Sequence, residues 1–208
     1  MTRTRIKFCG MTRVEDALDA IDLGVDAIGI VLTARSKRFA GLERAREIRR
    51  AVPPFVAVVT LFMDDEPAFI AEAVSRVAPD LLQFHGGEAA ADCVRYGRPY
   101  LKAVAMGGGD WRAVIDAHPQ AAGFLLDGHG AGEQGGSGRT FDWSAAPRAG
   151  GKPFVLAGGL GAENVGAAIA AARPFAVDVS SGIESAPGVK DADRMQRFVA
   201  AVRAADAA

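Results

Sequence analysis

Cys9 is the residue of this 208-residue sequence best placed to act as a base or nucleophile, because it ends a strand-like run at residues 6–9 and precedes Gly10 and a helical pattern. A thiolate at this point gains from the amide groups at the helix start and from cations such as Lys7 or Arg38. We therefore interpret Cys9 as a candidate catalytic residue. The alternative is a packing role, since free cysteines are commonly buried in protein cores.

Asp127 is the matching candidate acid, and it closes the apolar run at residues 123–126. A partly desolvated carboxyl group has a raised pKa, which favours its protonated form. A helix cap or an ion pair with Arg139 is the alternative role. Residues 128–140 follow with six glycines, which indicates a lid that closes over a ligand. The alternative for this loop is a tolerated insertion.

Two late loops are rich in glycine and serine. One contains Gly158 and Gly159 and leads into a helical pattern, and the other contains Ser180, Ser181 and Gly182. Glycine lets the backbone approach a phosphate closely, and helix starts supply amide donors. We interpret both loops as a phosphate-binding site, the alternative being that the glycines only form tight turns.

Further polar groups lie near the ends of predicted strands. His85 follows the fourth strand-like run and Asp178 lies in the eighth, and we expect both to contact a substrate. The three histidines, His85, His118 and His129, do not have the spacing of metal ligands. The histidine spacing therefore predicts no metal site.

These residues must be positioned by a repeated pattern of elements. Strand-like runs cover residues 6–9, 26–32, 55–62, 81–84, 100–104, 123–126, 154–156 and 175–179. A first helix is predicted to start at a capping box of Thr12 and Glu15 and to stop at Gly24. Further helical patterns cover residues 42–52, 65–77, 88–96, 111–118, 162–172 and 192–205, with a weak short helix near Trp143.

This order gives eight βα units, and the strand-like runs are almost entirely apolar, as in a parallel sheet that helices cover. We therefore predict an α/β protein consisting of one (β/α)8 barrel over residues 1–208, with an open doubly wound sheet as the alternative. In such barrels the active site lies at the carboxyl ends of the strands. That rule brings the candidate residues to one mouth, with Arg38 expected opposite the two late loops.

Composition excludes several classes of protein. The formal net charge is −1, so the sequence has no general electrostatic attraction to nucleic acid or to an anionic membrane. The sequence contains no secretory leader pattern and only two cysteines, Cys9 and Cys93, which favours a reducing cytoplasm.

The motifs together resemble the phosphoribosylanthranilate isomerases of tryptophan biosynthesis. The resemblance begins with Lys-Phe-Cys-Gly-Met-Thr at residues 7–12 and continues through residues 36–38, 82–86, 125–127 and 135–138. It ends with residues 141–143, 157–160 and 177–184, so that it spans nearly the whole chain. Phe8 departs from it by replacing a more usual aliphatic residue, and Ala34 stands where proline is common.

The resemblance implies an Amadori rearrangement of N-(5-phosphoribosyl)anthranilate. By analogy with the family, Asp127 is the general acid that opens the ribose ring and Cys9 is the base that removes the C2 proton. Arg38 would bind the anthranilate carboxylate, for which a guanidinium group is suited. The substrate is a small phosphosugar, and the expected form is a monomer or homodimer.

Two other functions stay open at this point. A barrel isomerase of histidine biosynthesis performs the same rearrangement, but relatives of that kind place aspartate where Cys9 stands. A phosphosugar-binding barrel without catalytic activity is the alternative from another class, and the pairing of Cys9 with Asp127 argues against it.

Overall fold

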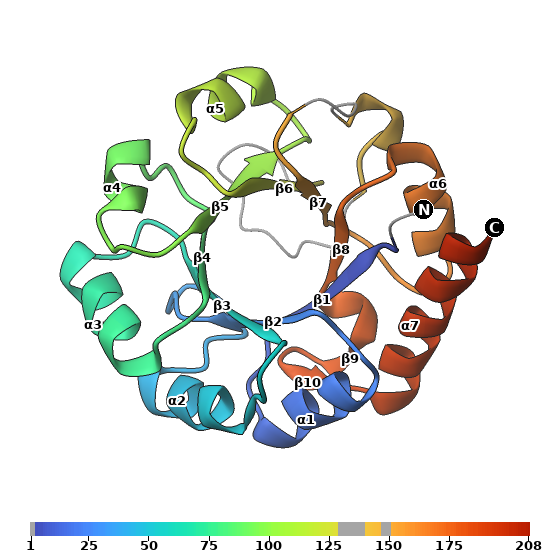
Figure 1. Ribbon diagram of the computed structural model, residues 1–208, viewed down its shortest axis with the longest axis horizontal. Coiled ribbons are helices and arrows are strands. Elements are labelled where there is room, and N and C mark those ends of the chain that lie inside the picture. The colour runs from blue at the N-terminus through green and yellow to red at the C-terminus, as the bar shows by residue number, and fades with distance from the viewer. Residues whose placement is uncertain (1–2, 129–139, 147–150) are drawn as a thin grey trace.

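Eight parallel strands form a closed barrel in the computed structural model, which describes residues 3–128, 140–146 and 151–208 (Figure 1). Each strand pairs with the next in the chain, and the last pairs with the first. The open doubly wound sheet is therefore excluded. The strands are β1 (Arg5–Cys9), β2 (Ala27–Val31), β3 (Ala57–Phe62), β4 (Leu81–Phe84), β5 (Tyr100–Ala105), β6 (Gly123–Asp127), β7 (Phe154–Leu156) and β8 (Ala176–Val179).

Helices surround the barrel in a ring (Figure 1). In the described part of the chain they are α1 (Val14–Asp22), α2 (Leu42–Ala51), α3 (Pro67–Val77), α4 (Ala90–Val94), α5 (Trp111–Ala117), α6 (Val165–Ala172) and α7 (Ala192–Ala207), with 3₁₀ turns η1 (Trp143–Ala145) and η2 (Ser181–Ile183). Local signals explain several starts. Pro67 occupies the first turn of α3, where its missing amide hydrogen is not needed. The Asp110 carboxylate accepts hydrogen bonds from two amides at the start of α5.

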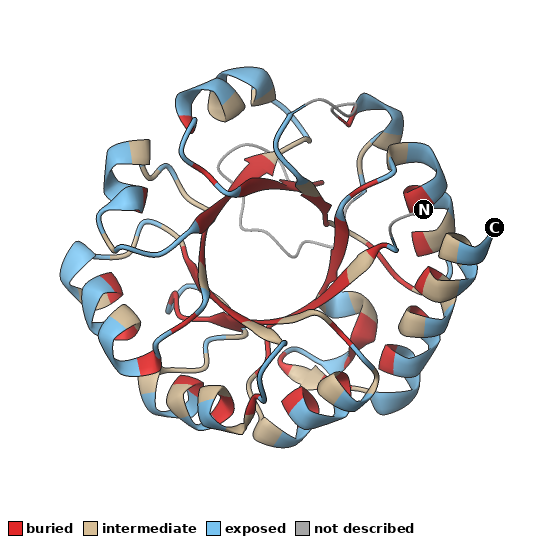
Figure 2. Cartoon of the chain, in the orientation of Figure 1, coloured by how far each residue is buried: buried red, intermediate tan, exposed pale blue. Residues whose placement is uncertain are grey.

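The alternation of side chains along each strand separates two apolar layers. Outward-facing residues such as Phe8, Ile30 and Leu126 are buried against the helices. Phe8, where the sequence departs from the family pattern that it resembles, packs edge-on against Phe198 of α7. Inward-facing residues fill the barrel itself: Val31, Val59, Leu61, Leu101, Ala103, Leu125, Val155, Ala157 and Ala176. Figure 2 shows the barrel as a nearly continuous ring of buried backbone, which explains why the strands read as unbroken apolar runs.

The predicted start of α1 is wrong. The residue before the helix is Arg13, which makes no side-chain capping bond. The hydroxyl of Thr12 instead donates a hydrogen bond to the carbonyl of Gly188, 176 positions away in the sequence. The helix does end before Gly24, whose φ of +80° favours glycine.

Gly188 belongs to a hairpin that the sequence analysis missed. The strands β9 (Glu184–Ala186) and β10 (Val189–Lys190) pair antiparallel between β8 and α7. Pro187 and Gly188 form the turn, and Gly188 has a φ of +80°. A Pro-Gly pair is a turn signal that could have predicted the hairpin.

The start of β1 and the end of α7 lie close together at the side of the barrel opposite its carboxyl mouth. The amide of Thr4 donates to the carboxylate of Asp206 at 2.9–3.0 Å, and Arg203 donates to the carbonyl of Thr4 at 3.1 Å. Within the described residues, no helix has the length and apolar character needed to cross a membrane.

Candidate active site

A cavity opens at the carboxyl ends of the strands. Every site residue predicted from the sequence except Gly182 lines it, namely Cys9, Arg38, His85, Asp127, Gly158, Gly159, Asp178, Ser180 and Ser181. Apolar side chains complete the wall, among them Val31, Leu61 and Leu160. The barrel thus brings together residues that are up to 172 positions apart in the sequence, as the strand-end rule predicts.

Cys9 is almost completely buried at the end of β1, with 6% of its surface exposed. Its backbone lies beside Gly29 of β2, where a Cβ atom would come within 2.9 Å of the sulfur and 3.1 Å of the Lys7 ammonium. Gly29 therefore leaves the space in which the thiol and the ammonium lie together. Burial raises the pKa of the Cys9 thiol above its usual value, while the positive charges of Lys7 and Lys190 act in the opposite direction.

Lys7 lies below the thiol and forms a buried ion pair with Asp178, at 2.6 Å between Nζ and Oδ1. Burial alone would lower the pKa of Lys7, but Asp178 and Cys9 raise it above its ordinary value, so the lysine stays charged. The predicted proximity of Lys7 to Cys9 is confirmed. Asp178 points into the barrel as the partner of this cation and lies within electrostatic range of Asp127.

Asp127 ends β6 and is buried in the wall of the same cavity. Its backbone is held by β5, because the amide of Met106 donates to the Asp127 carbonyl at 2.8 Å. Two strands, β7 and β8, separate β6 from β1 on the short way around the barrel. The acid and base candidates therefore line the cavity from separate parts of its wall. Most of the predicted lid at residues 128–140, Arg139 included, lies outside the described residues.

The sequence analysis expected Arg38 opposite both late loops, and this expectation is wrong. Its side chain extends over Gly10 and forms a two-pronged ion pair with Glu184, with both N–O distances at 2.8 Å. Glu184 follows η2 directly after β8. The sequence analysis did not include Glu184 among the site residues, and the carboxylate of Glu184 attracts the guanidinium of Arg38 toward β8.

The loop after β7 has the backbone conformation expected of its glycines. Gly158 and Gly159 have φ values of +83° and +61°. The side chain of Asn164 fastens the loop, accepting from the amide of Gly161 at 2.9 Å and donating to the carbonyl of Gly159 at 2.8 Å. The helix that follows begins at Val165, three residues later than predicted.

The loop after β8 packs against this first loop. Ser180 and Ser181 line the cavity, and the Ser180 hydroxyl donates to the carbonyl of Cys9 at 3.0 Å. Gly182 lies behind them, where a Cβ atom would collide with the carbonyl oxygen of Leu160. Glycine at position 182 is thus required for the close approach of the two loops, and this residue does not line the cavity.

His85 lies just beyond β4 in the cavity wall, and its ring contacts the side chain of Gln83. Cys93, by contrast, is fully buried in α4 against the outer core. Among the described residues, no group of three or more histidine, cysteine, aspartate or glutamate side chains could hold a metal ion.

Sequence reasoning gave no role to Glu184 or Lys190, which lie beside the cavity. Lys190 donates to the carbonyls of Cys9 and Ser180 and to the Glu184 carboxylate. Each of these contacts depends on the hairpin. Glu184 and Lys190 flank a Pro-Gly turn, which is a signal for the hairpin but not for these contacts.

Comparisons with known proteins agree on one family. The sequence profile described as N-(5'-phosphoribosyl)anthranilate (PRA) isomerase matches residues 6–201. An N-(5'-phosphoribosyl)anthranilate isomerase of Pseudomonas aeruginosa (strain UCBPP-PA14) is 53% identical over 206 residues, covering 98% of this chain and 97% of the relative.

Solved structures agree as well. The phosphoribosyl anthranilate isomerase of Thermotoga maritima is 40% identical with a TM-score of 0.88, covering 97% of this chain and 99% of that one. A phosphoribosyl anthranilate isomerase in complex with reduced 1-(o-carboxyphenylamino)-1-deoxyribulose 5-phosphate is 37% identical with a TM-score of 0.81, over the same shares of the two chains.

Proposed function

Since this chain belongs to the N-(5'-phosphoribosyl)anthranilate isomerase family, we propose how its residues carry out the reaction. The enzyme is an isomerase of tryptophan biosynthesis and converts N-(5-phosphoribosyl)anthranilate into 1-(2-carboxyphenylamino)-1-deoxyribulose 5-phosphate. One observation carries the proposal: Cys9, Asp127, Arg38 and the two late loops all line a single cavity.

The first step is a proton transfer from Asp127 to the ribose ring oxygen. The bond between this oxygen and C1 breaks, and the lone pair of the anilino nitrogen forms the C1–N double bond of a Schiff base. The burial of Asp127 in the cavity wall supports its role as the proton donor, because a desolvated carboxyl group favours its protonated form.

In the second step the thiolate of Cys9 removes the proton from C2. The electron pair of the broken C–H bond forms a C1–C2 double bond, and the electrons of the C1–N double bond return to nitrogen. The resulting enolamine becomes the ketone when C1 gains a proton and the C2 hydroxyl loses one. The positive charges of Lys7 and Lys190 support the thiolate form. Both steps are proton transfers, so the proposal requires no cofactor.

Binding is assigned to three parts of the cavity. Backbone amides of the loops that contain Gly158, Gly159, Ser180 and Ser181 bind the phosphate, and Gly182 allows these loops to meet. Arg38 binds the anthranilate carboxylate with the N–H groups that Glu184 does not use. His85 and Asp178 contact the substrate between these ends.

The remaining features follow from this chemistry. Residues 1–208 act as one catalytic domain, as a monomer or a homodimer, on a small phosphosugar rather than on nucleic acid or a membrane. A base that works as a thiolate must stay reduced, which supports a cytoplasmic location. Sedimentation velocity at catalytic concentration distinguishes the monomer from the dimer.

The decisive experiment follows the loss of phosphoribosylanthranilate fluorescence with the purified chain and three variants. Cys9→Ser and Asp127→Asn should each lower kcat by about 10²–10⁴-fold, because each retains the shape of the side chain but not its proton chemistry. Cys93→Ser is the matched control, because it removes a thiol from the outer core and not from the cavity. This variant should keep its turnover. Full activity of Cys9→Ser would refute the assignment of the base, and a parent chain without turnover would indicate a binding protein.

A further inference from the structure

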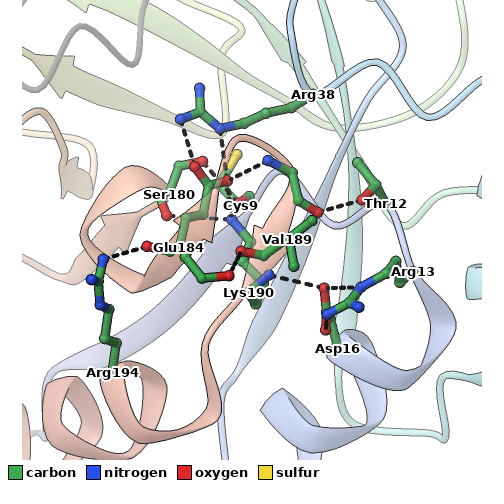
Figure 3. A network of polar contacts seen from close by, with 12 residues as sticks. Cys9, Thr12, Arg13, Asp16, Arg38, Ser180, Glu184, Val189, Lys190 and Arg194 are labelled. Atoms are coloured by element: carbon green, nitrogen blue, oxygen red, sulfur yellow. Dashed lines mark hydrogen bonds and ion pairs between the residues drawn. The ribbon is translucent and has the colours of Figure 1, made fainter.

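The side chain of Lys190 is fully buried beside the cavity and uses all three of its ammonium hydrogens. Its Nζ donates to the carbonyl of Cys9 at 2.6 Å, to Oε1 of Glu184 at 2.8 Å and to the carbonyl of Ser180 at 3.3 Å (Figure 3). A neutral amine has only two hydrogens to donate. The three acceptors therefore select the charged form of Lys190, although burial lowers its pKa.

Glu184 is shared between two cations. Its carboxylate accepts the two-pronged pair from Arg38 and the contact from Lys190, and Oε1 also accepts from the amide of Gly188 at 3.2 Å. Burial alone would raise the pKa of Glu184, but Arg38 and Lys190 hold it below its ordinary value. The carboxylate thus stays ionised between two positive charges.

Because Glu184 pairs with both Arg38 and Lys190, it does not neutralise the whole positive charge of the group. An isolated arginine–glutamate pair is neutral overall and attracts a further carboxylate only weakly. Here Arg38 and Lys190 carry two positive charges against the single negative charge of Glu184, and the neighbouring Asp16 is matched by Arg13. Arg194, which donates to the carbonyl of Glu184, is likewise matched by Asp191. As long as Cys9 is the neutral thiol, the group therefore holds one net positive charge, and of its members Arg38 lines the cavity.

We propose that Glu184 and Lys190 together determine the specificity for a carboxylated substrate: Glu184 orients the guanidinium of Arg38, and Lys190 cancels the charge of Glu184 so that Arg38 still attracts an anion. Both are positioning residues that act through Arg38. The inference rests on the proposed binding of the substrate carboxylate by Arg38.

A charge-rescue experiment tests this proposal. Lys190→Met makes the group neutral and should raise the KM for phosphoribosylanthranilate and the Kd of reduced 1-(o-carboxyphenylamino)-1-deoxyribulose 5-phosphate about tenfold. Adding Glu184→Gln restores one net positive charge and should recover part of that loss, because glutamine keeps one acceptor oxygen for Arg38 but not the two-pronged contact. Inhibition by inorganic phosphate, which lacks a carboxylate, should stay within about twofold in both variants.

Thr12→Val is the matched structural control, because it removes a hydrogen bond to the same hairpin without changing its charge. It should leave the ratio of analogue to phosphate affinity unchanged. If the double variant is as impaired as Lys190→Met, or if phosphate affinity falls equally, the role of Lys190 is only structural and the proposal is wrong.

Two further variants separate the possible failures. If Lys190→Met does not fold, Glu184→Asp tests the proposal instead. This variant keeps every charge but moves the carboxylate away from Arg38 by one methylene. An unchanged KM would overturn the orienting role of Glu184. Arg38→Met tests the premise. If Arg38→Met leaves KM unchanged, the proposed carboxylate site fails, whereas an effect of Arg38→Met with none of Lys190→Met refutes this inference alone.

Discussion

At the scale of single residues, the thiol of Cys9 faces two opposing influences. Burial disfavours the thiolate, and the ammonium groups of Lys7 and Lys190 favour it. Asp178 opposes the thiolate as well, although its pairing with Lys7 limits that effect. The outcome is a pKa above the usual thiol value, which has a consequence for the pH dependence of the rate.

We predict that kcat/KM rises with pH through an apparent pKa above about 8.5, the ordinary thiol value. The sign follows from the chemistry, since the thiolate is the active form and a raised pKa moves its formation to higher pH. Lys7→Gln removes a favourable positive charge and should move this limb further upward. A pH–rate profile between pH 6 and 10 provides the measurement, and a downward shift in Lys7→Gln would contradict the assignment.

Residues with intrinsic chemistry could be predicted from the sequence, and residues that act through others could not. Cys9 and Asp127 stand at the ends of apolar runs, so the strand-end rule finds them. Lys190 acts on the carbonyl of Cys9, which is 181 positions away. No local pattern encodes such a contact, because it depends on a hairpin folding back over the barrel mouth.

At the scale of elements, the phosphate loops depend on their mutual packing as much as on their own conformation. Gly182 is the contact point, with the Leu160 carbonyl where a Cβ atom would lie. The predicted helix start after the first loop was displaced, since Asn164 uses its side chain to hold that loop closed. The approach of the two loops is thus a tertiary contact, whereas the later helix start follows from local contacts of the Asn164 side chain.

We predict that Gly182→Ala forces the two loops apart and weakens inhibition by inorganic phosphate about tenfold or more. Gly166→Ala, within α6, is the matched control, because the new Cβ atom would lie 3.9 Å from its nearest neighbour, the Cβ atom of Ala205. That control should leave phosphate affinity unchanged and stabilise the protein by roughly 0.5–1 kcal/mol, as alanine does in a helix. Equal phosphate inhibition of Gly182→Ala and the parent would refute the role of this contact.

The junction of α5 with β5 predicts a response of stability to acid. His118 is buried at the end of α5, and its Nδ1 lies 3.2 Å from the hydroxyl of Tyr100. Burial lowers the pKa of His118, and the charge of Lys102 adds to this effect. Below the unfolded-state pKa of about 6.5, the unfolded chain binds a proton that the folded chain resists, so stability falls as the pH falls.

We therefore expect the free energy of unfolding, measured with urea, to decline between pH 7 and pH 5. His118→Phe should decline less over the same range, whatever its stability at pH 7, because it has no group to protonate. His85→Phe serves as a comparison at the other histidine described. Parallel declines in the parent and His118→Phe would show that other groups cause the acid sensitivity.

At the scale of the whole molecule, the sequence predicted the barrel because all eight strands are buried on both faces and therefore appear as apolar runs. Their bounds agree with the structure to within a few residues. The Pro-Gly pair at residues 187–188 is a local signal for the hairpin, but the true start of α1 depends on the contact of Thr12 with Gly188, which no local pattern shows. Local sequence patterns thus encode the repeated strands and helices. The start of α1 and the contacts of the hairpin depend instead on residue pairs that are distant in the sequence.

The barrel also separates stability from catalysis along its axis. The junction of Thr4 with Asp206 joins β1 to α7 at the side away from the cavity, and the amide of Thr4 is nearly buried. An unsatisfied buried donor costs about 1–3 kcal/mol. Since nothing in this junction lines the cavity, its loss should affect folding and leave the chemistry unchanged.

We predict that Asp206→Ala lowers the free energy of unfolding by roughly 1–2 kcal/mol, equivalent to about 2–8 °C in Tm for a chain of this size, while kcat and KM at 25 °C stay within about twofold. Asp193→Ala, in the exposed first turn of the same helix, should change Tm by far less. Calorimetry and the fluorescence assay on the same preparations supply both measurements. A loss of kcat in proportion to the loss of stability would mean that the closure of the barrel at its far end controls the geometry of the site, and that the two faces are not independent.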